Sequence, residues 1–461
     1  MHSHASAFDV IDSLPTPFGL IRSGVAPDHQ DVKNASSDFS QIFSDSRIRY
    51  FGGVTVGEDV GLEDLEECYD AVVLSYGCEG GTVMSLGDDS DSDSSTPDCV
   101  YHARKLVDWY NGRPNSSPPE FRLTEEGDLN VTIVGGGNVS LDCARIILKA
   151  AVEDQSLTTS DVTNEAYNRL KEITSKANKV NVRILNRRGG MQSAFTIKEF
   201  RDLFKMSKVG KMGMKILSSE VEKSENEESL EELKGTRPLK RLWKLIGDVS
   251  ANSEEGEKAN LEVRYFLSPK GYERRDDGGV SSLKCDVTKL EGAAFGQRAK
   301  KTGEEEDVES SLVLYSTGYK GKVLEGLEEF FEDGKYVNEG GRVGVRGGGG
   351  EGGSEGGSRY YASGWIKRGA SGIVGTNIPD AKETVMSMVA DFEGEGGGVR
   401  RRKNFEEILR KRGVRWVDWK GWKKVDEVEK RRDRVRVEEQ VREKIVDLEE
   451  LMTIGGGGKV E

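Results

Sequence analysis

The chain has 461 residues, which is long enough for about three domain-sized units and a sizeable buried core. Hydrophobic residues make up 35% and aromatic residues 7%, a composition that argues against full disorder. Lys and Arg number 67 against 81 Asp and Glu, and the net charge of −14 disfavours non-specific binding of nucleic acid or anionic membranes. No apolar run approaches the roughly 20 residues of a membrane-spanning helix, and a peripheral association with a membrane is left open.

The cysteines exclude two further classes of protein. None of the five belongs to a C-x-x-C pair, so neither a disulfide scaffold nor a zinc ribbon is expected and no metal site is predicted. Reduced thiols are the simplest interpretation of Cys68, Cys78, Cys99, Cys143 and Cys285. The first ten residues have neither a basic region nor an apolar stretch, so no targeting segment is visible.

Four compositional features divide the chain. The acidic run 88–95 and the glycine tract 347–357 are expected to be mobile surface loops. The glutamate-rich stretch 223–234 fits either an exposed helix or disorder. From residue 400 onward, charged residues surround three tryptophans, which predicts a helical tail whose tryptophans pack back on a domain.

Short apolar runs recur between these features and are separated in several places by helical patterns. A strand that is covered on both faces of a sheet reads as a continuous apolar run, so each run predicts a buried parallel strand. The runs lie at residues 71–74, 131–134, 180–185 and 312–315. Their alternation with helices predicts an α/β protein with doubly wound sheets.

The strongest local motif is VTIVGGGNVSLDCAR at residues 131–145, where a strand runs into Gly135, Gly136 and Gly137. Glycines let the backbone turn tightly and approach a pyrophosphate, which then lies at the N-terminus of the following helix. Ser140 takes the position where the fingerprint usually has glycine, and a plain strand-to-helix turn remains the alternative.

Two arginines follow the strand at 180–185, where a Rossmann unit meets the adenosine ribose. An acidic residue at this place selects NAD, whereas arginines accommodate the 2′-phosphate of NADP, so Arg187 and Arg188 favour NADPH. The alternative is a surface basic pair in a turn.

Several longer stretches resemble the adrenodoxin reductase family, the mitochondrial-type NADPH:ferredoxin oxidoreductases. They include LPTPFGLIRSGVAPDHQDVKN at 14–34, YDAVVLSYG at 69–77, DWYNG at 108–112, NRRGGMQSAFTIKEFR at 186–201 and SGWIKRGASGIVGTNIPD at 363–380, besides residues 134–145. Shorter matches return at 412–415 and 442–447. The resemblance covers nearly the whole chain and implies a mitochondrial flavoprotein that holds FAD and NADPH and passes electrons to a [2Fe–2S] ferredoxin.

The resemblance also implies the domain organisation. Two doubly wound Rossmann-like domains are expected, with the FAD-type domain discontinuous. Residues 1–98 and 316–461, including the charged tail, would form the FAD-type domain, and residues 99–315 the NADPH-binding domain. The family begins with a strand, a G-x-G-x-x-[GA] turn and a helix that bind the FAD pyrophosphate, and this unit is missing here. We interpret the FAD-type domain as N-terminally incomplete.

Site residues follow from the matching positions of the family. The pyrophosphate of NADPH would be lined by Gly135, Gly136, Gly137, Asn138 and Val139. Its 2′-phosphate would be held by Arg187 and Arg188, with Glu199 beside them. The adenosine side of FAD would meet Asp12, Leu20 and Val56, and the isoalloxazine would meet Trp365, Gly372, Ile373 and Val374. His29 and Asp142 would lie near the flavin and tune electron transfer without donating hydride.

The resemblance further favours a docking surface for an acidic ferredoxin. Basic residues recur at intervals of three and four from 237 onward, which places them on one helix face. The candidates are Arg201, Arg237, Lys240, Arg241 and Lys244, with Lys234 nearby. A solvated basic helix is the alternative for this segment. For the whole chain, the alternative is an NADP-binding protein without turnover that acts through protein contacts.

Overall fold

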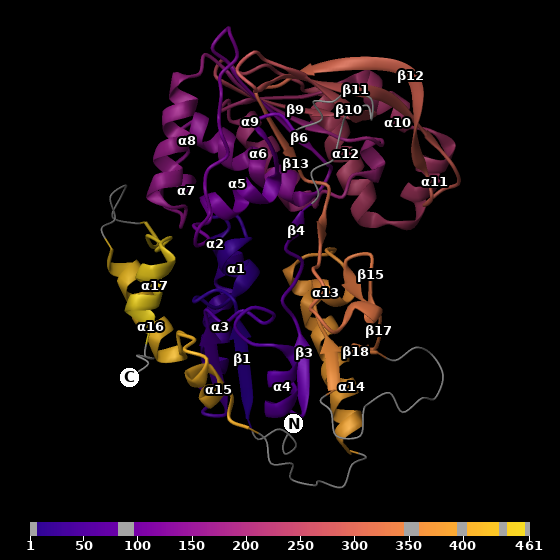
Figure 1. Ribbon diagram of the computed structural model, residues 1–461. Coiled ribbons are helices and arrows are strands. Elements are labelled where there is room, and N and C mark those ends of the chain that lie inside the picture. Colours follow the sequence, from indigo (N-terminus) through magenta and orange to yellow (C-terminus); the bar gives the residue numbers. More distant parts are fainter. Residues whose placement is uncertain (1–6, 82–95, 345–358, 394–402, 433–439, 457–461) are drawn as a thin grey trace.

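The computed structural model describes residues 7–81, 96–344, 359–393, 403–432 and 440–456. The two loops predicted at 88–95 and 347–357 lie outside these ranges. Figure 1 shows an upper part, built from residues 96–315, and a lower part, built from residues 7–81 and the described residues from 316 onward. Within the described ranges, no helix has the length and apolar character needed to cross a membrane.

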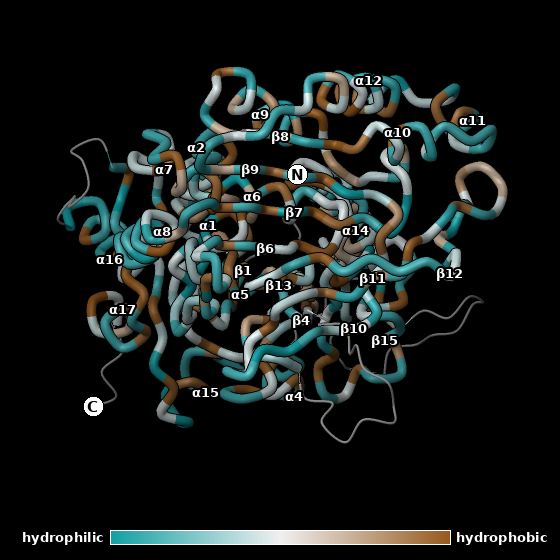
Figure 2. The backbone as a smooth tube through the Cα atoms, turned by 90° about the horizontal axis from the view of Figure 1, so that it is seen from above, coloured by the Kyte–Doolittle hydropathy of each residue, from teal (hydrophilic) through white to brown (hydrophobic). Residues whose placement is uncertain are grey.

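The upper part is organised around a six-stranded sheet in which all neighbours are parallel. Its strands, in spatial order, are β5 (Val100–His102), β13 (Leu312–Tyr315), β6 (Leu129–Val134), β7 (Val180–Leu185), β9 (Ala259–Arg264) and β8 (Gly213–Ile216). In Figure 2, strands β8, β9, β7, β6 and β13 follow one another from top to bottom in this spatial order. Every residue of β6 and β13 is buried, so the continuous apolar runs at 131–134, 180–185 and 312–315 are confirmed as strands of a parallel sheet.

Helices surround this sheet and complete the α/β architecture. They are α5 (Ala103–Tyr110), α6 (Asn138–Ala151), α7 (Gln155–Thr158), α8 (Asn164–Lys176), α9 (Ile197–Lys208), α10 (Ser218–Ser224), α11 (Glu227–Gly235) and α12 (Arg237–Ala251). The glutamate-rich stretch 223–234 is therefore mostly helical. A three-stranded antiparallel sheet lies beside them and consists of β10 (Leu267–Arg274), β11 (Val280–Glu291) and β12 (Arg298–Glu309).

The lower part contains two short parallel pairs. Strand β1 (Phe8–Asp12) pairs with β2 (Ile48–Gly52), and β3 (Ala71–Leu74) pairs with β19 (Arg359–Ala362). The second pair continues through antiparallel β18 (Arg342–Val343) and β17 (Asn338–Glu339). Burial of β3 was predicted wrongly for part of the strand, because Val73 is 42% exposed. The strand stands at the end of its sheet, and its only strand neighbour among the described residues is β19.

Helices of the lower part come from both ends of the chain. They are α1 (Gly19–Ser23), α2 (Gln30–Lys33), α3 (Ala35–Ile42), α4 (Leu62–Cys68), α13 (Trp365–Arg368), α14 (Asn377–Glu393), α15 (Phe405–Lys411), α16 (Trp419–Arg431) and α17 (Leu448–Gly455). The tail packs back as expected: Trp422 is 3% exposed and lies edge-on to Phe18, with ring centroids 5.9 Å apart. The division into domains at residues 98 and 316 stays a prediction.

The two parts are joined by backbone and by buried charge. A ribbon of β4 (Gly80–Gly81) and β14 (Tyr319–Lys320) runs between them (Figure 1). The Asp161 carboxylate of the upper part pairs with Lys33 and Lys444 of the lower part, each at 2.8 Å. Although burial by itself raises the pKa of Asp161, the two ammonium groups hold that pKa well below its usual range.

The glycine turn after β6 is set by steric limits that differ from one glycine to the next. Gly135 has φ 130°, and a Cβ at this position would lie 2.3 Å from the carbonyl oxygen of Ser316. A Cβ on Gly136 would lie 1.8 Å from Oδ1 of Asn186. A Cβ on Gly137, by contrast, would meet no atom within 4 Å. The first two glycines are therefore needed by the fold, whereas the third leaves open space.

This difference gives a matched pair of variants. Gly135→Ala should lower the free energy of unfolding by about 1–3 kcal/mol or more, because it adds backbone strain and a clash with the main chain of residue 316. Gly137→Ala should leave the thermal unfolding midpoint nearly unchanged. Calorimetry of both variants checks the assignment, and an equal loss in both would contradict it.

Candidate functional site

The glycine turn and the arginine pair lie at one edge of the six-stranded sheet. Val134, the last residue of β6, is opposite Leu185, the last residue of β7, so the segments that follow emerge side by side. Gly137 is the N-cap of α6, whose first amide groups and dipole favour an anion. The edge is also where the chain reverses direction across the sheet, the usual place for a ligand of a doubly wound fold.

A loop that follows the arginines returns to the turn and holds it in shape. The Ala194 amide donates to the Gly136 carbonyl at 2.8 Å, and the Thr196 amide donates to Oδ1 of Asn138 at 2.8 Å. Asn138 thus orders the loop through its side chain, while Val139 is half-buried. The residues predicted to line a pyrophosphate are brought together around the helix start.

Arg187 and Arg188 are both exposed at the end of β7. Nη2 of Arg188 makes a long contact of 3.4 Å to the Gln192 carbonyl oxygen. Two accessible guanidinium groups beside the open space at Gly137 and the start of α6 fit a dinucleotide that carries an additional phosphate. Glu199, which was expected beside these arginines, directs its carboxylate to His29 and Arg145.

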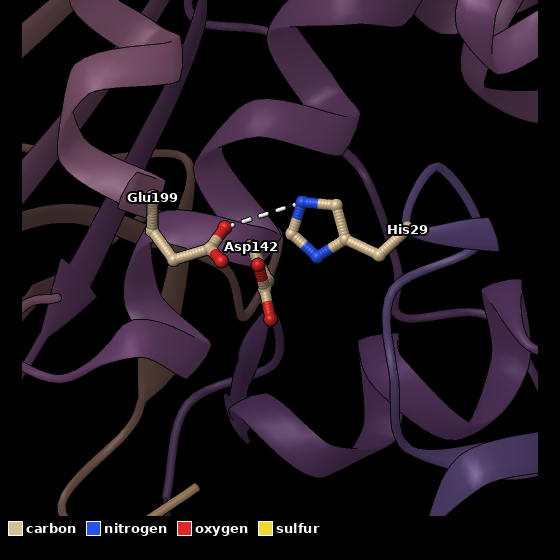
Figure 3. Close-up of side chains that lie close together, drawn as sticks. All are labelled: His29, Asp142 and Glu199. Carbon is tan, nitrogen blue, oxygen red and sulfur yellow. Dashed lines mark ion pairs between the residues drawn. The ribbon is translucent and has the colours of Figure 1, made fainter. Parts of the chain in front are cut away.

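Three predicted residues meet where the two parts of the molecule face each other. His29 precedes α2, Asp142 lies on α6 and Glu199 lies on α9, and Figure 3 shows their side chains converging. Nε2 of His29 is 3.2 Å from Oε2 of Glu199. One imidazole nitrogen of His29 and one carboxylate oxygen each of Asp142 and Glu199 lie within 4.8 Å of one another. We call these three residues the histidine–carboxylate cluster.

Two residues of this region were not singled out from the sequence. Arg145 donates to Asp142 at 2.7 Å and to Glu199 at 3.1 Å, so its guanidinium already occupies an oxygen of each carboxylate. It also makes a two-pronged bond to Asp28. The i,i+3 spacing of Asp142 and Arg145 within the glycine motif was the available signal. The link to Asp28 had none.

Burial gives the cluster its chemistry. The pKa of Glu199 is raised, chiefly because desolvation penalises its charged form, although Arg145 and His29 oppose that rise. A carboxyl group with a raised pKa beside an imidazole can hold and release a proton at a fixed position. The cluster is therefore suited to holding and releasing a proton at this place.

The residues predicted for the flavin are spread over the lower part. Asp12 ends β1, accepts the Leu14 amide at 2.9 Å and has its pKa raised to about 6 by burial. Leu20 on α1 is 41% exposed, and Val56 is half-buried after β2.

The isoalloxazine candidates follow β19. Trp365 stacks on Tyr319 with ring centroids 5.8 Å apart. Gly372 has φ 82°, Ile373 is 59% exposed, and Val374 begins the short 3-10 turn that leads into α14.

These positions fit FAD in part. Exposed Leu20 and Ile373 offer apolar surface that ring systems can cover, and Asp12 offers an acceptor to a ribose hydroxyl. In the described stretch from residue 7 to β2, no strand leads through a glycine turn into a helix that could hold a second pyrophosphate. These residues are compatible with the two ends of FAD, and a cradle for its pyrophosphate is not among the described residues.

Comparisons with known proteins give a consistent family. No protein-family model matches the chain. NADPH:adrenodoxin oxidoreductase of Arabidopsis thaliana is 35% identical over 456 residues, covering 96% of this chain and 89% of that protein. The human mitochondrial protein of the same name is 32% identical over 462 residues, covering 97% and 87%. FprA of Mycobacterium tuberculosis, solved in complex with NADPH, aligns with a TM-score of 0.82 at 30% identity, covering 97% and 92%.

The structural match covers 97% of this chain and therefore extends over both parts of the fold. At this identity and coverage, the chain belongs to the adrenodoxin reductase family of oxidoreductases.

Proposed function

We propose that the protein oxidises NADPH and passes the electrons through FAD to a [2Fe–2S] ferredoxin. The observation that carries the proposal is the placement of the glycine turn after β6 next to the arginine pair after β7. The relatives named NADPH:adrenodoxin oxidoreductase and the NADPH complex of FprA support this proposal.

The upper part would supply the dinucleotide site. Amide groups at the start of α6 would bind the pyrophosphate across Gly137, and the guanidinium groups of Arg187 and Arg188 would bind the 2′-phosphate. FAD, when bound, accepts a hydride and releases electrons one at a time. Asp12, Leu20 and Val56 would hold its adenosine side, and residues 365–374 its isoalloxazine side.

The histidine–carboxylate cluster would manage the proton. Hydride oxidation followed by single-electron release leaves a proton that must be stored or discharged. His29 and Glu199 face each other at 3.2 Å and share a position for it, while Asp142 adds negative charge nearby. In this role the residues tune electron transfer and do not donate hydride.

A spectrum and a turnover assay test the function. The purified chain, reconstituted with FAD, should show a flavin absorbance band and oxidise NADPH when a [2Fe–2S] ferredoxin is added. NADPH binding without flavin uptake or turnover would instead support the NADP-binding, non-catalytic alternative.

Variants of the cluster extend the same assay. His29→Gln and Asp142→Asn should each slow ferredoxin reduction by roughly tenfold or more, and should slow reduction of ferricyanide less. Equal effects on both acceptors would contradict a role in the transfer to ferredoxin.

The arginine pair sets the choice of cofactor. Replacing both Arg187 and Arg188 by alanine should raise the Kd for NADPH by about a hundredfold, because two charge-assisted contacts to a phosphate are lost. Binding of NADH should change by less than about twofold, since NADH lacks that phosphate. Titration with both nucleotides gives the comparison, and equal losses would rule out the assignment.

The docking surface would lie on α12. Arg237, Lys240, Arg241 and Lys244 are exposed on this helix, and none of them forms an ion pair with another described residue. Lys234 and Arg201 are also exposed, but Lys234 pairs with Glu231 at 3.1 Å. Uncompensated positive charge on an otherwise acidic protein favours an acidic partner and raises its encounter rate.

Charge reversal tests this surface. Arg237→Glu with Arg241→Glu should raise the KM for ferredoxin by roughly tenfold at low salt and flatten its salt dependence. Ferricyanide reduction should not change. Arg169→Glu with Lys176→Glu on α8, on the other side of the upper part in Figure 1, makes the same change in net charge and serves as the control. An unaltered KM in the α12 variant would refute the docking proposal.

A mitochondrial location is proposed on the names of the relatives, several of which are mitochondrial. Imaging of the native gene product fused to a fluorescent protein tests this, and a purely cytosolic signal would contradict it.

A further inference from the structure

We propose that Arg145 is a positioning residue that holds the histidine–carboxylate cluster in its working geometry and couples it to the contact between the two parts of the molecule. The effect of Arg145 on turnover rests on the proposed function, whereas its positioning role follows from the hydrogen bonds of its own side chain.

All three nitrogen groups of the Arg145 guanidinium are engaged. Nε and Nη2 donate to the two oxygens of Asp28 at 2.7 and 3.0 Å. Nη2 also donates to Asp142 at 2.7 Å, and Nη1 donates to Glu199 at 3.1 Å. The side chains of Arg145 and Asp28 are each 1% exposed, so the pair between them is shielded from solvent. The planar fork thereby fixes three carboxylates relative to one another.

Each carboxylate comes from a different part of the fold. Asp28 lies between α1 and α2 in the lower part and directly precedes His29, Asp142 lies on α6, and Glu199 lies on α9. The bond to Asp28 therefore sets where His29 stands relative to Glu199 across the junction. Lys149 lies one helical turn beyond Arg145 and donates at 2.8 Å to Oδ2 of Asp28, the oxygen that also accepts from Nε of Arg145.

The charge balance depends on the same residue. The groups that face the guanidinium are Asp28, Asp142, Glu199, His29 and Lys149, with buried Cys143 and Tyr110 beside them. Asp202 and the ion pair of Lys198 with Asp31 lie further out on α9 and its neighbour. Without Arg145, the three carboxylates would keep Lys149 and His29 as cationic partners, with Lys198 acting on Glu199 from further away. The proton affinity of Glu199 should then rise, because the cation that favours its charged form is gone.

Arg145→Gln removes the charge and the fork together. It should lower kcat for ferredoxin reduction by roughly tenfold to a hundredfold, with the KM for NADPH changed less than about twofold. The pH profile of kcat should move upward by about one unit, because the proton leaves Glu199 less readily.

Arg145→Lys separates charge from geometry. A lysine keeps the positive charge but cannot make the same three-way contact. It should restore the pH profile to that of the native protein while kcat stays reduced. This variant decides the question even where Arg145→Gln fails to fold: native kcat in Arg145→Lys would overturn the proposal.

Arg22→Gln is the matched control. Arg22 is also buried, 7% exposed, and forms a two-pronged bond to Glu429, but neither residue touches the cluster. This variant should lose stability without shifting the pH profile. If Arg22→Gln and Arg145→Gln reduce kcat equally and leave both profiles unshifted, Arg145 has only a structural role and the proposal fails.

A measurement without turnover keeps the two proposals apart. The Glu199 carboxyl carbon, assigned by its loss in Glu199→Gln, can be titrated by NMR in the full chain without NADPH. Its midpoint should be higher in Arg145→Gln than in the native protein or Arg22→Gln. That shift would support the positioning role even where the native protein proved unable to reduce ferredoxin, and its absence would overturn the role irrespective of activity.

Discussion

Buried charge between the two parts of the molecule is the constraint on which the site depends. Two carboxylates at the junction each form ion pairs with two cationic side chains from the opposite part. Asp28 pairs with Arg145 and Lys149. Asp161 pairs with Lys33 and Lys444. A buried ion is costly unless it is fully paired, and an apolar contact tolerates sliding in a way that such pairs do not. The junction consequently allows few relative positions of the two parts. His29 and Glu199 come from opposite sides of this junction and face each other at 3.2 Å in the arrangement that these pairs hold.

Backbone sterics supply the second constraint. Positive φ at Gly135 and the close approach of Asn186 to Gly136 turn the chain sharply at the end of β6, which leaves the start of α6 open toward the next strand end. No side chain need be placed to bind a pyrophosphate there, because main-chain amides are already directed at the space. In the proposed site, selectivity between nucleotides would come from the few side chains that follow β7, and Arg187 and Arg188 are exposed there.

Local sequence patterns predicted many of the strands and helices, but they could not predict contacts between residues that are far apart in the chain. Three of the four apolar runs are strands whose neighbours cover them, and the glycine motif opens α6 as its spacing indicated. Exposure of Val73 depends on which strands lie beyond β3, and a single run carries no such information. The contacts of Arg145 could not be predicted from the sequence for the same reason. Its bond to Glu199 joins residues 54 positions apart, and its bond to Asp28 joins residues 117 positions apart.

The ion pair between Arg22 and Glu429 has a consequence for folding during synthesis. These residues are separated by 407 positions, and each is buried against the other. On a ribosome, the arginine emerges long before the glutamate exists, so the first segment must wait in an unfinished state while the six-stranded sheet, whose strands all lie between residues 100 and 315, can already assemble. The segment that holds α1 and β1 therefore completes its native contacts only after the C-terminal helices have been synthesised.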